Sequence, residues 1–324
     1  MSEINDIRAF IKPEMEKFEP FFKTAVKSNV PLLDIIMNYI IRRKGKQMRP
    51  MFVFLSAKLI GEVTESTYTA AALIELLHTA TLIHDDVVDN SNKRRGFFSV
   101  NALWRSKIAV LAGDYLLSKG LLLAIRNKEF ELLEIVSEAV KEMAEGELLQ
   151  LEKSRKLDIS EKTYFEIIYK KTATLIASCT AAGAASAKAE KDQIESLKQF
   201  GKYAGITFQI KDDLFDYQKT NLTGKPSGND IQEKKMTLPL IYALKNSEKS
   251  QKRHILKLIG KSSGKQNHVK QILDFVIEKQ GLEYTEKIME EHKNSALKAL
   301  NDFPETESKK HLQSLVNYIT IRKK

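Results

Sequence analysis

The chain has 324 residues, 43% of them hydrophobic and 29% charged, which is typical of a folded globular protein and excludes a disordered one. Its formal net charge is +10, and its single cysteine, Cys179, excludes an internal disulfide and indicates a reducing compartment. No uninterrupted apolar run reaches the roughly 18 residues of a membrane span, and the first residues lack the pattern of a secretory signal, so we expect a cytoplasmic protein.

Helical periodicity predicts α-helices along the chain, and patterns typical of strands are nearly absent. In chain order, we expect long helices over residues 66–90, 129–153 and 160–187. Ser66, Thr67 and Thr69 offer capping hydroxyls at the start of the first of these helices. Gly, Ser and Asn content predicts loops over residues 96–99, 221–230 and 262–267.

Two acidic clusters share the spacing D-D-x-x-D, and each follows an apolar helical run. They are Asp85, Asp86 and Asp89 in the first cluster and Asp212, Asp213 and Asp216 in the second. On a helix, the first and last aspartates of each cluster lie one turn apart on one face. Carboxylates on one face suit Mg²⁺, which takes few protein ligands and completes its shell with water and phosphate oxygens. The alternative is that these acids pair with neighbouring Lys or Arg, but their place at the ends of apolar runs indicates the mouth of a cavity.

Cations near the clusters could bind phosphate, arginine through two parallel hydrogen bonds and lysine as a point charge. They are Lys46, Arg49, Arg94, Arg95, Lys170, Lys171, Lys225 and Lys235. Each of these cations, taken alone, is more simply explained as a solvated surface charge. Together they would suffice for two diphosphate groups.

The segment from Lys245 to Lys270 holds eight Lys or Arg and one acid, Glu248, a net charge of +7. We favour a solvated connector between helices; the alternative is a weak attraction to anionic lipid surfaces or nucleic acid. No aromatic residue lies among these cations, which argues against stacking on nucleic-acid bases.

These residues together resemble the trans-isoprenyl diphosphate synthases, or polyprenyl synthetases, over about residues 44–244, with weaker agreement to Arg322. The long-chain members, such as octaprenyl and heptaprenyl diphosphate synthases, are the ones that the chain resembles. The resemblance implies an all-α fold, a single large helical bundle over residues 1–324 that surrounds a deep central cavity, and a homodimer. It also implies the reaction, in which isopentenyl diphosphate is condensed head-to-tail with an allylic diphosphate. The implied cofactor is Mg²⁺, three ions with substrate bound, with Mn²⁺ as the alternative metal.

The resemblance further implies a role for each matching residue. Asp85, Asp89 and Asp212 would hold the metal, supported by Asp86, Asp213 and Asp216. Arg94, Lys171 and Lys235 would contact the allylic diphosphate, and Lys46, Arg49, His78 and Arg95 the isopentenyl diphosphate. Thr172 and Gln209 would act with Lys171 at the reacting carbons, and Lys225 and Asp230 would close a loop over the site. His84 is interpreted as structural, because released pyrophosphate can accept the final proton.

The chain departs from the family pattern at two places. Lys234 replaces the glycine that usually precedes the position of Lys235, so the turn there must adopt a conformation open to a side chain. Phe97 and Phe98 occupy positions where a proline or a small residue is common.

Product length should depend on the helix before Asp85, because one helical turn of about 5.4 Å matches roughly one isoprene unit. Ala80 and Thr81, one turn before the cluster, are small, and Leu77 lies deeper. We therefore expect a product longer than fifteen carbons. The alternative is that these small residues only pack against another helix, such as residues 110–124, which supplies the floor instead.

Three other functions are weighed against this one. A class I terpene cyclase shares the first cluster, but its second metal motif normally mixes Asn or Asp, Ser or Thr and Glu. A non-catalytic helical partner subunit would be expected to lose one aspartate cluster, and this chain keeps both. A nucleic-acid binder rests on charge alone, so we expect no nucleic-acid partner and at most weak peripheral membrane contact.

Overall fold

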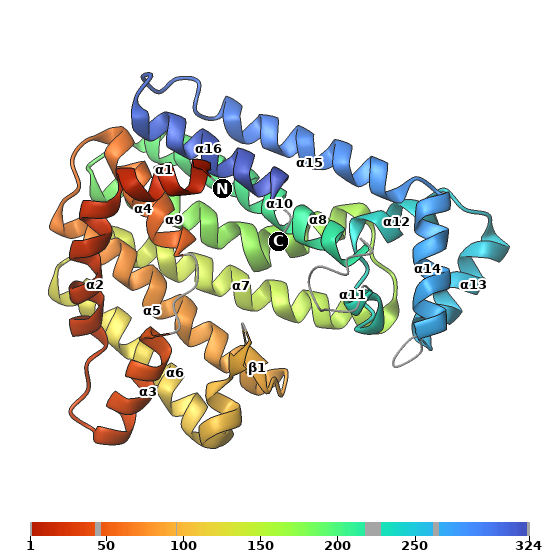
Figure 1. Ribbon diagram of the computed structural model, residues 1–324, viewed down its shortest axis with the longest axis horizontal. Helices are drawn as coiled ribbons and strands as arrows, with labels where there is room; N and C mark the ends of the chain where they lie inside the picture. The colour runs from red at the N-terminus through yellow and green to blue at the C-terminus, as the bar shows by residue number, and fades with distance from the viewer. Residues whose placement is uncertain (1, 43–46, 95, 218–227, 262–265, 323–324) are drawn as a thin grey trace. The chain divides into compact units, whose positions relative to one another are not determined.

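A computed structural model describes residues 2–42, 47–94, 96–217, 228–261 and 266–322 (Figure 1). The predicted all-α class is confirmed, since helices account for nearly all of the regular structure among these residues. The chain forms two compact units, each described here by itself. The first unit comprises Met1–Val140, Ser178–Lys198 and Phe303–Leu312, and the second comprises Lys141–Ala177, Gln199–Asp302 and Gln313–Lys324. A single domain over residues 1–324 stays a prediction.

The elements follow this division. The first unit holds α1 (Ser2–Phe10), α2 (Lys12–Val26), α3 (Pro31–Ile41), α4 (Met48–Ile60), α5 (Glu65–Val88), β1 (Lys93–Arg94), β2 (Phe97–Phe98) and α6 (Val100–Arg126). The second holds α8 (Glu161–Ile168), the π-helix η1 (Tyr169–Ala173), α11 (Asn229–Gln232), α12 (Leu238–Lys245), α13 (Lys249–Gly260), α14 (Gln266–Glu278) and α15 (Gly281–Lys298). Each unit contains part of α7 (Phe130–Lys156), α9 (Thr174–Ser186), α10 (Lys191–Tyr217) and α16 (Glu307–Ile321).

The core of the first unit is built on α5, where Leu73 and Ile74 are fully buried. The N-cap of this helix is Thr64, whose backbone N–H donates to Thr67 Oγ1 at 3.1 Å. The helix therefore begins one residue before the predicted start at Ser66. A hydrogen bond of this kind stabilises a helix start by supplying partners to groups that lack them within the helix.

Helix α6 runs antiparallel to α5 at close range. A Cβ atom at Gly113 would overlap the His84 ring, and one at Gly120 would lie 3.3 Å from Leu73 and Leu77. His84 Nε2 lies 3.3 Å from the carbonyl oxygen of Val110, which agrees with a structural role for this histidine. Residues 110–124, whose orientation cannot be read from sequence, therefore lie alongside α5.

The second unit has its own apolar core. Ile210 of α10, Leu240 of α12 and Ile272 of α14 are fully buried in it. α10 carries the second acidic cluster, and α12 and α14 follow it in sequence, so this core fixes the helix that carries the cluster.

Several predicted boundaries need correction. Residues 160–187 do not form one helix but α8, η1 and α9 in succession. Within residues 96–99, Phe97 and Phe98 pair with β1 in a short antiparallel hairpin around Gly96, whose φ is +80°. Of the loop predicted over residues 221–230, residues 221–227 lie outside the described part, and Asn229 already begins α11; likewise residues 262–265 lie outside it, and α14 begins at Gln266.

One face of α6 exposes apolar side chains. They are Leu103, Val110, Leu111, Leu121, Leu122 and Ile125, each at least 40% exposed. By length and composition this helix could also cross a membrane, although a third of its most apolar window is buried in the protein.

Candidate active site

The first acidic cluster lies where α5 ends. Asp85 and Asp86 are in the last turn, and Asp89 is the C-cap, its N–H donating to the carbonyl oxygen of Asp85 at 2.8 Å. Asp86 is buried, Asp85 half-buried and Asp89 exposed. The backbone thus places Asp85 and Asp89 one turn apart, as their spacing predicts.

This cluster opposes the helix dipole. Carboxylates at a helix C-terminus face its partial negative charge, and each such contact is unfavourable by about 0.3–1 kcal/mol. The last turn of α5 contains no basic residue. A cation bound near these carboxylates would offset the repulsion.

The second cluster lies near the end of α10, where buried hydrogen bonds hold Asp213. Its Oδ1 accepts a hydrogen bond from Gln209 Nε2 at 2.8 Å, and its Oδ2 accepts one from Tyr164 Oη at 2.7 Å. Gln209 Oε1 in turn accepts from Thr172 Oγ1 at 2.8 Å. These four side chains form one chain of hydrogen bonds, which fixes the direction of the Gln209 amide.

Asp216 has different hydrogen-bond partners from Asp213. Its carboxylate accepts the backbone N–H groups of Asn229 at 2.9 Å and Asp230 at 3.0 Å, at the start of α11. The second cluster therefore fixes the segment that contains Asp230.

Burial and the charge of Asp230 disfavour the charged forms of Asp213 and Asp216. Burial, and then the charge of Asp230, raises the pKa of Asp213 to about 7 and that of Asp216 to about 6. Burial also raises the pKa of Asp230. A cation bound beside these carboxylates would favour their charged forms.

The π-helix η1 carries Lys170, Lys171 and Thr172. π-turns inside helices are rare and frequent at functional sites. Here two glycines admit the bulge: a Cβ at Gly146 would lie 2.7 Å from Lys170 Cβ, and one at Gly205 would lie 2.5 Å from Ala173 Cα. The helices on either side can therefore approach η1 only because these two residues lack side chains.

The lysines that sequence reasoning assigned to the allylic diphosphate both pair with acids. Lys171 Nζ lies 2.5 Å from Glu147 Oε2, and Lys235 Nζ lies 2.5 Å from Glu233 Oε2 and 3.7 Å from Asp230 Oδ1. A phosphate group would compete with these carboxylates for the two ammonium groups.

A cavity of about 150 Å³ in the second unit brings six predicted residues together. They are Lys171, Thr172, Gln209, Asp213, Asp230 and Lys235. Tyr164, Gln150 and Met236 also line it. Cations, hydroxyl and amide dipoles and carboxylates therefore meet beside an apolar wall.

The turn before Lys235 has the conformation that glycine favours. Lys234 has a φ of +59°, in the small left-handed region that an L-residue enters at a cost of roughly 1–2 kcal/mol. The backbone N–H of Lys235 donates to the carbonyl oxygen of Asp230 at 2.7 Å, which keeps Lys235 beside the cavity despite the substitution.

Asp212 pairs with the far end of the chain. Arg322 Nη2 lies 2.5 Å from Asp212 Oδ1, and the guanidinium carbon lies 4.0 Å from the Phe208 ring centroid. The Arg322 side chain is 10% exposed. A cation thus already occupies one oxygen of this carboxylate.

In the first unit, Arg49 forms an ion pair with Glu75 of α5, Nε to Oε1 at 2.6 Å. His78 is half-buried on the same helix. Ala80 is fully buried, Leu77 is 3% exposed, and half-buried Thr81 donates its hydroxyl to the carbonyl oxygen of His78 at 2.8 Å.

Three predicted residues, Lys46, Arg95 and Lys225, lie outside the described residues. Arg94 is described only by its backbone, which pairs with Phe97. The expectation that both clusters open on one central cavity stays a prediction.

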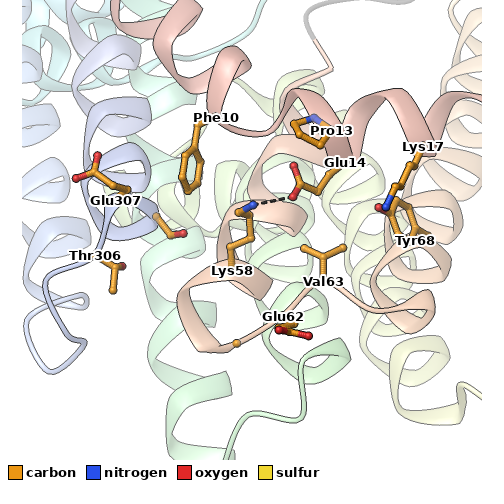
Figure 2. Close-up of a pocket in the computed structure, with 12 residues that line it drawn as sticks. Phe10, Pro13, Glu14, Lys17, Lys58, Glu62, Val63, Tyr68, Thr306 and Glu307 are labelled. Atoms are coloured by element: carbon orange, nitrogen blue, oxygen red, sulfur yellow. Dashed lines mark hydrogen bonds and ion pairs between the residues drawn. The ribbon is translucent and has the colours of Figure 1, made fainter.

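A second cavity, of about 470 Å³, lies in the first unit (Figure 2). Its lining includes Phe10, Tyr68 and the ion pair of Lys58 Nζ with Glu14 Oε1, at 2.6 Å. None of the sequence-predicted residues lines it. Size alone therefore does not locate the candidate active site.

Sequence reasoning missed several residues that contact the predicted ones. Among them are Glu75, Glu147, Tyr164, Glu233 and Arg322. The separations of Tyr164 from Asp213 and of Arg322 from Asp212 are 49 and 110 residues. No local pattern reports such contacts, so no signal in a single sequence could have identified them.

The acidic clusters suit a divalent ion shared with phosphate. Within the described ranges, no three His, Cys, Asp or Glu side chains converge into a ready-made metal cage. Mg²⁺ is usually held by one or two carboxylates plus substrate phosphates. The opposed helix dipole and the raised pKa values both indicate that these carboxylates fit such an ion.

Comparison with known proteins gives concordant matches. The family model described as "Polyprenyl synthetase" matches residues 30–276. Octaprenyl diphosphate synthase of Haemophilus influenzae is 33% identical over 322 residues, 99% of this chain and 97% of that protein. The structure of a Caulobacter crescentus polyprenyl synthase complexed with calcium and isoprenyl diphosphate has a TM-score of 0.90, with 31% identity over 99% of this chain and 98% of that one. That of a Bacteroides thetaiotaomicron geranylgeranyl pyrophosphate synthase has a TM-score of 0.84, with 36% identity over 99% and 100%.

Proposed function

Since this chain belongs to the polyprenyl synthetase family and is a prenyltransferase, we propose that it condenses isopentenyl diphosphate head-to-tail with an allylic diphosphate. The product is an all-trans polyprenyl diphosphate longer than fifteen carbons. The observation that carries the proposal is the second-unit cavity, where two lysines, the Thr172–Gln209 pair and the carboxylates of Asp213 and Asp230 meet.

Each acidic cluster holds divalent ions in this proposal. Asp85, Asp89 and Asp212 are the ligands, and Asp86, Asp213 and Asp216 support them. The family uses a divalent metal, and we propose Mg²⁺ for this chain. When bound, the metal neutralises the charge that builds up on the departing diphosphate.

The chain's own cations bind the diphosphates. Lys171 and Lys235 exchange their carboxylate partners for the allylic diphosphate and share that role with Arg94. Arg49 and His78, with Lys46 and Arg95, bind isopentenyl diphosphate. Lys225 and Asp230 belong to the segment that closes over the bound substrates.

In the reaction, the allylic carbon–oxygen bond breaks and leaves an allylic carbocation. This carbocation must react with the alkene of isopentenyl diphosphate before water reaches it. The electron pair of that bond leaves with diphosphate, the alkene of isopentenyl diphosphate forms the new carbon–carbon bond, and the released pyrophosphate takes the proton lost. Thr172 donates its hydrogen to Gln209, so the lone pairs of its oxygen remain to face positive charge. Preorganised dipoles of this kind stabilise a cation without reorganising.

The test is product analysis. The protein, Mg²⁺, labelled isopentenyl diphosphate and an allylic primer should yield a labelled diphosphate longer than fifteen carbons. A cyclic hydrocarbon without diphosphate, or no incorporation of label, would contradict the proposal.

Product length is tested at Thr81. Ala80 is fully buried, so a larger residue there would overpack the core, whereas Thr81 is half-buried. The variant Thr81→Phe should make shorter products if the tail passes this turn. An unchanged product distribution would place the tail elsewhere.

The protein is further proposed to act in the cytoplasm as a homodimer. The exposed apolar face of α6 supports the dimer, because a second copy of this helix would cover it. The variant Leu111→Arg, at a residue 58% exposed, should shift the mass measured by light scattering from dimer to monomer. A wild-type monomer would contradict this assignment.

A further inference from the structure

Helix α13 presents a line of cations that takes no part in the proposed site. Lys249, Arg253, Lys257 and Lys261, here called the basic row, follow one another at intervals of four residues, and all are exposed. Residues four apart lie on one helix face, so Lys249, Arg253 and Lys257 run in a line of about 12 Å along α13, and Lys261, its C-cap residue, follows them. Figure 1 draws α13 beside α14 at the right-hand end of the second unit.

The opposite face of α13 fixes the direction of the basic row. Ile255 is 4% exposed and Ile259 is fully buried, and both belong to the core of the second unit. Since this apolar side anchors the helix, the basic row faces solvent.

Folding stability does not account for the basic row. Like charges four residues apart destabilise a helix. Lys249 and Lys252 also lie in the first turn, which contains no acid, next to the positive end of the helix dipole. Within the described part of the chain, no acid forms an ion pair with the row, not even exposed Glu248 and Asp274. The row is thus a repulsive arrangement that a polyanionic surface would neutralise.

We propose that the basic row of α13 binds the surface of anionic lipid bilayers. The four cations are exposed and spaced along a line, so the ligand is an extended array of negative charges rather than one small anion. Each Lys or Arg near an anionic leaflet strengthens binding about fivefold. Single-stranded nucleic acid is less favoured because α13 has no Phe, Tyr or Trp to stack on bases. The proposal rests on charge and placement and does not depend on the proposed activity.

The experiment measures sedimentation of the full chain with vesicles at 0.15 M salt. The vesicles are phosphatidylcholine alone or mixed equally with phosphatidylglycerol. The test variant is Lys249→Gln, Arg253→Gln and Lys257→Gln together. The control variant, Lys23→Gln, Lys191→Gln and Lys198→Gln, removes the same charge from exposed positions of α2 and α10. Both variants change only exposed residues, and equal thermal midpoints verify folding.

We expect wild type and control to bind the anionic vesicles, and the partition coefficient of the test variant to fall about 100-fold, from three cations at about fivefold each. Binding should weaken as salt rises. Three results would each overturn the proposal: no wild-type binding, equal loss in both triple variants, or tighter binding to a DNA fragment than to the vesicles at the same salt. Polyprenyl synthesis from water-soluble substrates is expected to be the same in all three proteins, so loss of vesicle binding and loss of activity are separate readouts.

Discussion

Replacing Tyr164 by phenylalanine removes one buried hydroxyl and leaves the ring in place. In the wild type this hydroxyl donates to Asp213 Oδ2 at 2.7 Å, and Gln209 donates to Oδ1 at 2.8 Å. Tyr164 is 3% exposed and Asp213 is 4% exposed, so water cannot easily replace the lost donor. The substitution thus acts on the direction of Asp213, and through it on Gln209 and Thr172.

Above pH 7, where Asp213 is mostly charged, the expected effect follows from the energy of one hydrogen bond to a charged group, about 1.5–3 kcal/mol. Protein stability should fall by up to this amount. If this hydrogen bond contributes the same energy to positioning Gln209 in the transition state, its loss lowers kcat by at most about 10- to 150-fold. The KM for isopentenyl diphosphate should stay unchanged, because Arg49 and His78 are not in this hydrogen-bonded chain.

A matched control is Tyr284→Phe, which removes a phenol donor to Glu161 Oε1, at 2.5 Å, away from the cavity. Steady-state kinetics and thermal midpoints of both variants are compared with wild type. Tyr284→Phe should lower stability without lowering kcat. If Tyr164→Phe also leaves kcat unchanged, Tyr164 does not position the Thr172–Gln209 pair, and the reasoning fails.

Three further outcomes are expected. Asp85→Ala should abolish turnover with an unchanged circular dichroism spectrum; activity near that of wild type would refute the metal role of Asp85. Arg322→Met should lower the free energy of unfolding by roughly 1–3 kcal/mol, measured by denaturant unfolding. The Arg322 side chain is 10% exposed and that of Asp212 41%, so this ion pair lies between a buried pair and a surface pair. No change in stability would show that the pair is not formed in solution. Because the pKa of Asp213 is raised to about 7 in the folded state, its contribution to stability is greatest below about pH 4 and is lost as the pH rises through 7. In the absence of metal, the thermal midpoint of wild type minus that of Asp213→Asn should therefore decrease as the pH is raised from 4 to 8. If this difference increases instead, the pKa of Asp213 is not raised.

The parts of this protein that could be predicted from sequence depend on local spacing. Helical periodicity located α5 and α7 to within a few residues, and the intervals of four residues placed Asp85 one turn from Asp89. Such features depend on residues within one or two turns, whose interactions a sequence displays directly.

The rest depends on contacts between distant segments. The π-turn that interrupts residues 160–187 exists where Gly146 and Gly205 admit it, and neither glycine is near it in sequence. The pairs Arg49–Glu75 and Asp212–Arg322 likewise join segments that are distant in sequence. Helix propensity cannot predict the π-turn or these ion pairs, because tertiary packing between distant segments selects them.

The π-helix η1 behaves as an insertion of one residue into an otherwise continuous helix. Deleting Lys170 would let that stretch relax to ordinary helical winding, with α8 and α9 still in phase because the π-turn absorbs one extra residue. The side chains inside the turn would change direction, and Thr172 would lose its bond to Gln209 although neither of these two side chains had been removed. Catalytic alignment in this enzyme thus depends on the number of residues in one turn as well as on their identity.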